Sequence, residues 1–156
     1  MSTCTFIASN LPLEEFEPSQ DYPFHINLDD GTMDDGGADD NYFLFSFQDV
    51  DLYTDKHYGV YLEWDYTDGR AKNILEYIKV ALEKTDEIEL WRVWLMDYYE
   101  YEDRPIIHTS TISIHECTIQ DIKEIDCAPI WNHKDDPNRP SYYCLKIVKE
   151  YRKEHL

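Results

Sequence analysis

The sequence has few basic residues and no long apolar run, and both shortages exclude classes of protein. Only 14 lysines and arginines stand against 33 aspartates and glutamates, which gives a formal net charge of -19. A chain of this charge repels DNA, RNA and anionic membrane surfaces, so we predict no direct nucleic-acid binding and no membrane association. No apolar run approaches the length that spans a bilayer, and the N-terminus lacks the features of a signal peptide. We therefore expect a cytoplasmic protein.

Sites that depend on glycine or on paired cysteines are also missing from the sequence. With five glycines, the chain has no P-loop, no dinucleotide-binding pattern and no GxSxG turn. Its four cysteines form no CxxC pair, and we expect free thiols in preference to disulfides. These observations predict no cofactor and favour a non-enzymatic protein.

The acid is concentrated in the first half of the chain. We predict a single domain over residues 1–156, because 42% hydrophobic and 15% aromatic residues suffice to close one core. Residues 1–68 hold 16 acidic residues and one basic residue, whereas residues 69–156 hold 17 and 13. The segment 29–40 contains six aspartates, three glycines and no basic or aromatic residue, which predicts a mobile loop. The aspartate spacing does not match an EF-hand, so we expect only weak cation binding there.

Hydrophobic periodicity predicts an α+β fold. Residues 57–66 alternate as in a strand, and the spacing of apolar residues from Ala71 to Leu82 predicts an amphipathic helix capped near Asp68. Further strands are expected at residues 4–9, 42–48, 88–96, 106–114 and 142–149, with a short helix after Thr118 capped by Asp121. From residue 57 onward the order is strand, helix, strand, strand, helix, strand. This is the order of a two-layer ferredoxin-like fold, with a mostly antiparallel sheet, one long helix and one short helix after an N-terminal extension.

The strand at 88–96 does not fit a plain ferredoxin-like fold. It is apolar on both faces, which predicts an interior strand, whereas the second strand of that fold lies at an edge. We expect the strand at 43–47 to pack beside it or over it. We also expect a hairpin to connect 88–96 with 106–114.

Three segments of the chain resemble a group of small bacterial proteins to which no activity is assigned. They are CTFIASNLPL near the N-terminus, TDEIELWRVW at the turn into a strand, and ISIHECTIQDIKEID. The resemblance runs over most of the chain, although the Asp-rich segment is not part of it. It implies a bacterial cytoplasmic protein and brings no activity, cofactor or site residue with it.

The most informative candidate site combines acid with tyrosine. The segment 97–103 reads DYYEYED, and its candidate partner-binding residues are Tyr98, Tyr99, Glu100, Tyr101, Glu102 and Asp103. Tyrosine offers rigid contact area with a polar tip, and carboxylates attract lysine and arginine, which also stack on aromatic rings. The pattern predicts a basic protein partner, as for an immunity-type neutraliser of a nucleic-acid-cutting toxin or for a nucleic-acid mimic. The alternative is an ordinary hairpin turn that its acids keep soluble.

Two other hypotheses come from different classes of protein. A small metal-dependent enzyme or metal sensor would use His108, His115 and Cys117, although their spacing matches no structural zinc pattern. Glu63 and Asp65 share a strand face as an acid–base pair would, but an exposed strand face explains them as well. A plain domain that self-associates through an exposed strand edge is the third hypothesis. The sequence leaves the oligomeric state open.

Overall fold

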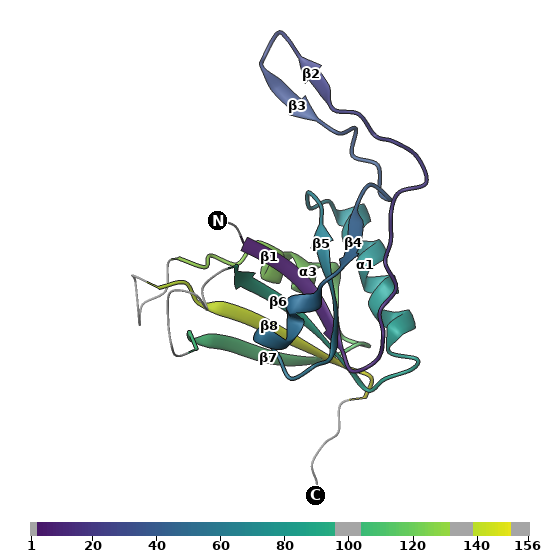
Figure 1. The fold of residues 1–156 in the computed structure, drawn as a ribbon. Helices are drawn as coiled ribbons and strands as arrows, with labels where there is room; N and C mark the ends of the chain where they lie inside the picture. The colour runs from purple at the N-terminus through teal and green to yellow at the C-terminus, as the bar shows by residue number, and fades with distance from the viewer. Residues whose placement is uncertain (1–2, 96–103, 132–138, 151–156) are drawn as a thin grey trace, which may run out of the picture.

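A computed structural model describes residues 3–95, 104–131 and 139–150 and confirms the α+β class (Figure 1). A six-stranded sheet carries two helices, α1 (Asp68–Ala81) and α3 (Ile119–Asp126). Across the sheet the strands are β4 (Phe43–Ser46), β5 (Tyr58–Glu63), β1 (Thr3–Ser9), β6 (Glu87–Trp94), β8 (Tyr142–Val148) and β7 (Ile107–Ser113). Every neighbouring pair is antiparallel except β7 and β8, which run parallel. The sheet is therefore mostly antiparallel, as predicted.

The helix α3 begins at its predicted cap, whereas α1 begins at the residue before its predicted cap. The backbone N–H of Thr118 donates to the carboxylate of Asp121 at 2.8 Å, which is the predicted arrangement at the start of α3. At α1 the cap is Thr67 and not Asp68, because the Thr67 hydroxyl accepts from the backbone N–H of Arg70 at 3.1 Å. The helix therefore begins one residue earlier than predicted.

Buried side chains form a separate core on each face of the sheet. One core joins the sheet to α1 and α3 through residues that include Ile74, Ile122 and Ile147. The other lies under the short 3-10 helix η1 (Gln48–Leu52), where the rings of Phe6 and Trp91 stack at 5.9 Å. Burial on both faces of the sheet explains why β6 has apolar residues on both of its sides.

The neighbours of β6 differ from the predicted ones. From β5 onward the described elements follow the predicted order along the chain, but β1 and β8 flank β6 in the sheet. The strand at 43–47, expected beside β6 or over it, pairs instead with β5 at the edge of the sheet as β4. The expected hairpin between β6 and β7 is also wrong, because β7 pairs with β8. A parallel pair needs a crossover between its strands, and α3 lies in that connection.

A two-stranded hairpin projects from the sheet between β1 and β4 (Figure 1). Its strands are β2 (His25–Asn27) and β3 (Thr32–Asp34), and we call residues 24–34 the arm. The prediction of a loop over residues 29–40 is wrong for three of these residues, which form β3. Asp30 shapes the turn by accepting from the Thr32 backbone N–H at 2.9 Å and from its hydroxyl at 2.7 Å, and Gly31 adopts a φ of 72°.

Candidate functional site

The predicted acid and tyrosine site falls outside the described residues. Tyr98, Tyr99, Glu100, Tyr101, Glu102 and Asp103 all lie in the segment 96–103, which the structure does not describe. Their role in binding a partner therefore stays a prediction.

The structure brings two of the three metal candidates together. His115 and Cys117 line a pocket of about 460 Å³ beside the end of α1, together with Lys79 and Lys149. Burial raises the pKa of the Cys117 thiol to about 11, which keeps it protonated near neutral pH. His108 lies near the opposite end of β7. It is about 17 Å from Ser113, the last residue of the strand, at 3.3 Å per residue. Among the described residues, no three His, Cys, Asp or Glu side chains converge as a metal site.

A pocket of about 660 Å³ lies at the base of the arm and combines aromatic with acidic side chains. Its aromatic walls are Tyr22, Phe24, Phe43 and Trp64, and its acidic residues are Glu17, Asp21, Asp35, Glu63 and Asp65. No lysine or arginine is found among the described residues that line it. We call it the arm-base pocket. Its composition is the chemistry predicted for the DYYEYED segment, at a different place in the chain.

Strand pairing and side-chain hydrogen bonds hold the walls of the arm-base pocket in place. Phe43 on β4 lies opposite Glu63 on β5, so one aromatic and one acidic wall come from neighbouring strands. Trp64 follows directly, and its indole N–H donates to the carboxylate of Asp126 on α3 at 3.0 Å. Tyr22 donates its hydroxyl to Asp40 at 2.5 Å, and this bond raises the pKa of the tyrosine. Contacts within the chain therefore hold these four lining residues in place without a ligand.

Arg70 anchors the chain that returns from the arm. Its side chain is 1% exposed, although guanidinium groups are rarely buried without partners. It donates to the carboxylate of Asp35 and to the backbone carbonyls of Ala38 and Asp65, each at 2.9 Å. The hydrogen bond from Arg70, followed by one from the Gly37 backbone, lowers the pKa of Asp35. The chain that directly follows the arm is therefore fixed to α1 by an ion pair whose guanidinium is buried.

Close packing at the start of α1 reinforces this anchor. The side chain of Asn73 donates to the carbonyl of Asp39 at 2.9 Å. Gly69 lies directly against the Asp39 carboxylate, and a Cβ at this position would overlap that group. A larger residue at this position would therefore require the exposed Asp39 side chain to move.

Four of the acids at the arm-base pocket are not neutralised within the described part of the chain. Asp35 is paired with Arg70, but no hydrogen bond or ion pair joins the carboxylates of Glu17, Asp21, Glu63 or Asp65 to another described residue. These four residues are exposed and line one cavity. An incoming cation would meet them without first breaking an internal ion pair.

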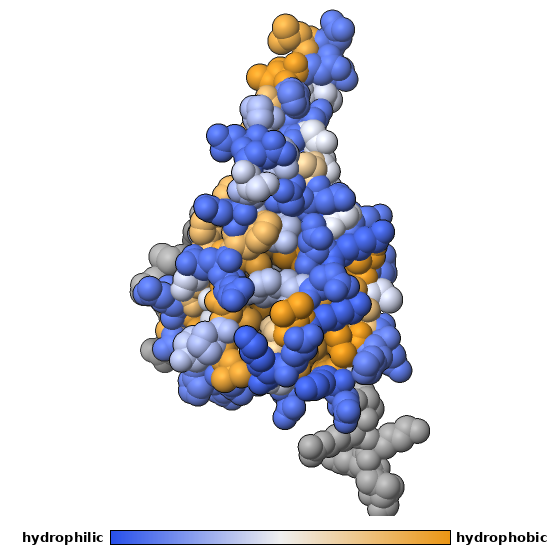
Figure 2. Space-filling view, turned by 90° about the vertical axis from the view of Figure 1, so that its right-hand side faces the viewer, coloured by the Kyte–Doolittle hydropathy of each residue, from blue (hydrophilic) through white to orange (hydrophobic). Residues whose placement is uncertain are grey.

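The arm above the pocket exposes large apolar side chains. Phe24, Ile26 and Met33 are each 62% exposed, and Leu28 is 90% exposed. Figure 2 shows apolar surface at the far end of this projection, between hydrophilic groups. Contiguous exposed apolar residues rimmed by polar ones are typical of an interaction surface. The alternation of Phe24, Ile26 and Leu28 is a strand-like pattern in the sequence from which the arm could have been predicted.

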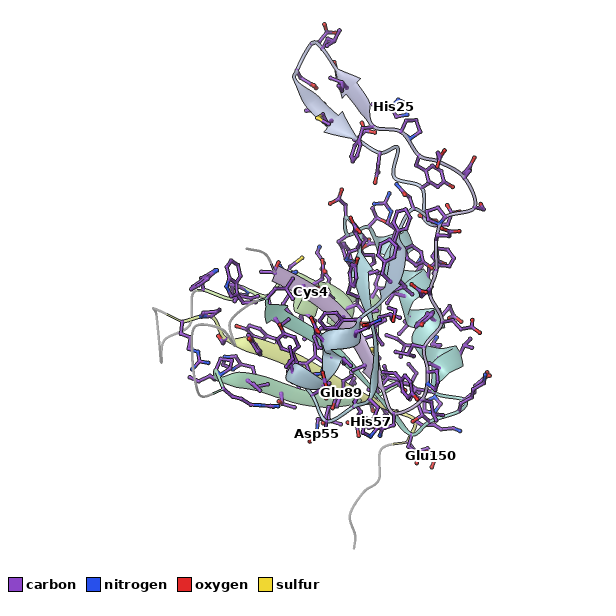
Figure 3. The ribbon with its side chains drawn as sticks, viewed as in Figure 1. Cys4, His25, Asp55, His57, Glu89 and Glu150 are labelled. Atoms are coloured by element: carbon purple, nitrogen blue, oxygen red, sulfur yellow. The ribbon has the colours of Figure 1, made fainter. Side chains whose placement is uncertain are left out.

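A buried carboxylate lies on the interior strand β6, away from the arm. Glu89 on β6 is 5% exposed and accepts from the Thr54 hydroxyl at 2.5 Å and from the Trp91 indole N–H at 2.8 Å. In Figure 3 it lies near Asp55 and His57 and away from His25 on the arm. Trp91 belongs to the core under η1 and Thr54 follows η1 in the chain, so this carboxylate holds the chain after η1 against the sheet.

Comparison with protein-family models found no match. No curated protein and no solved structure matched the chain either. The resemblance to small bacterial proteins therefore stays a prediction. None of the described helices combines the length and the apolar character needed to cross a bilayer.

Proposed function

We propose that this chain is a non-enzymatic cytosolic interaction protein that binds a basic protein. The arm supplies apolar contact area, and the arm-base pocket receives a lysine or arginine side chain of the partner. A neutraliser of a nucleic-acid-cutting toxin and a nucleic-acid mimic both fit this description. The observation that supports the proposal is a cavity with aromatic and acidic walls at the foot of an exposed apolar hairpin.

The lining of the arm-base pocket suits an organic cation better than a bare metal ion. A cation within about 6 Å of an aromatic ring gains roughly 0.5–2 kcal/mol from the ring, depending on how far it is desolvated. Phe24, Phe43 and Trp64 provide such rings, and the unpaired carboxylates supply charge-assisted hydrogen bonds to the same cation. Among the described residues, no cluster has the geometry of a metal site.

The shape and charge of the arm also favour a partner of opposite sign. An isolated two-stranded hairpin is only marginally stable in water, and packing against a partner adds stability. A second copy of this chain would bring a net charge of -19 to the same place, whereas a basic protein is attracted. Long-range attraction of this kind raises the association rate and weakens as salt is added.

Capture from a lysate of the source organism tests the proposal. The immobilised full chain is washed at low and then at moderate salt, and the eluted proteins are identified by mass spectrometry. We expect one basic protein at near-stoichiometric yield, released by salt. The double variant Asp21→Asn, Asp65→Asn should retain at least about tenfold less of it, which corresponds to about 1.4 kcal/mol.

A matched control separates local recognition from total charge. The double variant Asp49→Asn, Asp51→Asn makes the same change in net charge on exposed residues of η1, away from the arm-base pocket. It should retain the partner nearly as well as the original chain. Equal losses in both variants, or no specific capture by folded protein, would contradict the proposal.

The metal-dependent alternative keeps one supporting observation, which is the shared pocket of His115 and Cys117. Under this alternative, the purified chain holds stoichiometric zinc that is lost in His115→Ala. Zinc analysis of both proteins by plasma mass spectrometry decides between the two functions.

A further inference from the structure

The two edge strands of the sheet, β4 and β7, differ in how far their outer backbone groups are covered. At the β4 edge, Phe16 and Leu44 exchange two backbone hydrogen bonds, of 3.0 and 2.9 Å, so the chain before the arm covers this edge. The carboxylate of Glu15 accepts from the next outward backbone N–H, that of Ser46, at 3.0 Å. This edge offers few free groups to another strand.

The β7 edge has no such cover within the described part of the chain. No described strand pairs with its outer side, and Thr109, Ser110 and Thr111 are exposed. The strand reads IHTSTIS, without the lysine, proline or inward charge that protects most exposed edges. It is thus a seven-residue uncharged edge in a chain with 30% charged residues.

The centre of β7 is symmetric about Ser110, with Thr109 on one side and Thr111 on the other, so an antiparallel copy of the strand can pair with it there. With Ser110 opposite Ser110 of the copy, Thr109 faces Thr111, and His108 faces Ile112. Opposed residues of an antiparallel pair lie on the same face, and no position in this register opposes like charges. Threonine pairs across strands contribute roughly 0.2–1 kcal/mol each.

We propose that a second copy of this chain pairs with the β7 edge in this register and forms a two-fold symmetric dimer with a continuous sheet. The symmetry needs one surface only, because the same strand serves both copies. The inference is independent of the proposed function and leaves the arm of each copy free at the outer end of the sheet.

The distribution of charge permits this dimer in spite of the net charge. β5 lies four strand spacings from β7, or about 19 Å at 4.8 Å per spacing, and β4 lies about 24 Å away. The acid-rich first half of the chain supplies both strands and the arm. Repulsion between the two acidic regions therefore acts over more than the Debye length of about 8 Å at physiological salt.

Sedimentation equilibrium of the full chain tests the dimer, with Ser110→Lys, Ser110→Asp and their equimolar mixture. Each substitution places like charges opposite each other at the two-fold axis, so each variant alone should show a dimer dissociation constant raised at least about tenfold. The mixture pairs lysine with aspartate and should form dimers again. Gln48→Lys, at an exposed residue of η1, is the control and should dimerise like the original chain.

Each outcome of this experiment is decisive. The original chain should sediment at twice the 18.7 kDa chain mass, with the circular dichroism of all variants unchanged. A monomeric original chain would overturn the proposal. A dimer that survives in both single variants would show that another surface joins the copies, and would overturn it equally. Failure of the mixture to recover dimers would rule out the register about Ser110.

Discussion

The two ends of the sheet differ in charge, in shape and in how their edges are closed. The end with β4 and β5 carries the arm, an aromatic and acidic pocket and an edge covered by the chain before the arm. The end with β7 has no Asp, Glu, Lys or Arg along its outer strand, and no described strand covers that edge. Acid that served solubility alone would not need to gather at one end beside exposed apolar residues. The comparison therefore favours recognition at the arm end.

Removing Arg70 should disrupt the arm end most. Arg70→Met leaves the Asp35 carboxylate and two carbonyl groups without their donor, and breaking a buried pair typically costs about 3–5 kcal/mol. We expect a loss of this size in the free energy of unfolding, measured with urea, together with increased hydrogen exchange in the arm. The matched control is Lys79→Met, which breaks an exposed ion pair with Glu76 and should change stability by less than about 1 kcal/mol. Equal effects in the two variants would contradict the anchoring role of Arg70.

Removing Glu89 should destabilise the packing of the chain after η1 on the sheet and leave the arm unchanged. Glu89→Ala leaves the buried donors of Thr54 and Trp91 without an acceptor, which should lower the free energy of unfolding by about 2–3 kcal/mol. Glu89→Gln keeps an acceptor oxygen and should lose less. Urea unfolding gives the stabilities, and partner capture should be unchanged in the folded variants. Loss of capture with intact stability would show that the binding surface lies near Glu89 and not at the arm.

Low pH should remove the contribution of the Asp35–Arg70 pair to the free energy of unfolding. The folded state lowers the pKa of Asp35, so the pair stabilises the fold fully above the unfolded pKa of about 3.9 and loses this effect as the pH falls through the lower folded pKa. Near pH 7, Asp35→Asn should cost about 2 kcal/mol, as for a hydrogen bond to a charged group. The difference between variant and original chain in urea unfolding should shrink below about pH 4. A difference independent of pH would show that the carboxylate charge has no part in the anchor.

Apolar residues of the arm should matter for binding and hardly at all for stability. Phe24→Ser with Leu28→Ser changes exposed side chains, so the free energy of unfolding should shift by less than about 0.5 kcal/mol. Partner capture should nevertheless fall, because these side chains supply contact area in the proposed complex. The matched control is Val80→Ser on α1, a large apolar residue exposed to a similar degree, which should leave capture intact. Capture that survives in the double variant would remove the arm from the interface.

The sequence predicts elements with strong local signals and misses contacts between distant segments. The amphipathic spacing of α1 and the cap of α3 depend on neighbours a few residues away, and both are found in the structure. The pairing of β6 with β1 joins residues that are more than eighty positions apart, and periodicity carries no information about such partners.

The candidate site shows the same limit. No local pattern in the sequence predicted the arm-base pocket. The arm-base pocket draws Tyr22 and Phe24 from one segment and Phe43 and Trp64 from two others, and Arg70 on α1 fixes the chain between them. Only the fold brings these residues together. The one compact signal in the sequence, residues 97–103, lies outside the described residues.

Nuclear magnetic resonance titration of the isotope-labelled full chain with a hexalysine peptide tests recognition at the arm end most directly. We expect the shifts to concentrate at the Trp64 indole N–H and at the backbone of the arm, with little change at the indole of Trp91. The shifts should weaken in Asp21→Asn, Asp65→Asn and persist in Asp49→Asn, Asp51→Asn. Shifts that are spread evenly over the acidic surface, or that are equal in both double variants, would show that the acidic residues serve solubility and would contradict recognition at the arm end.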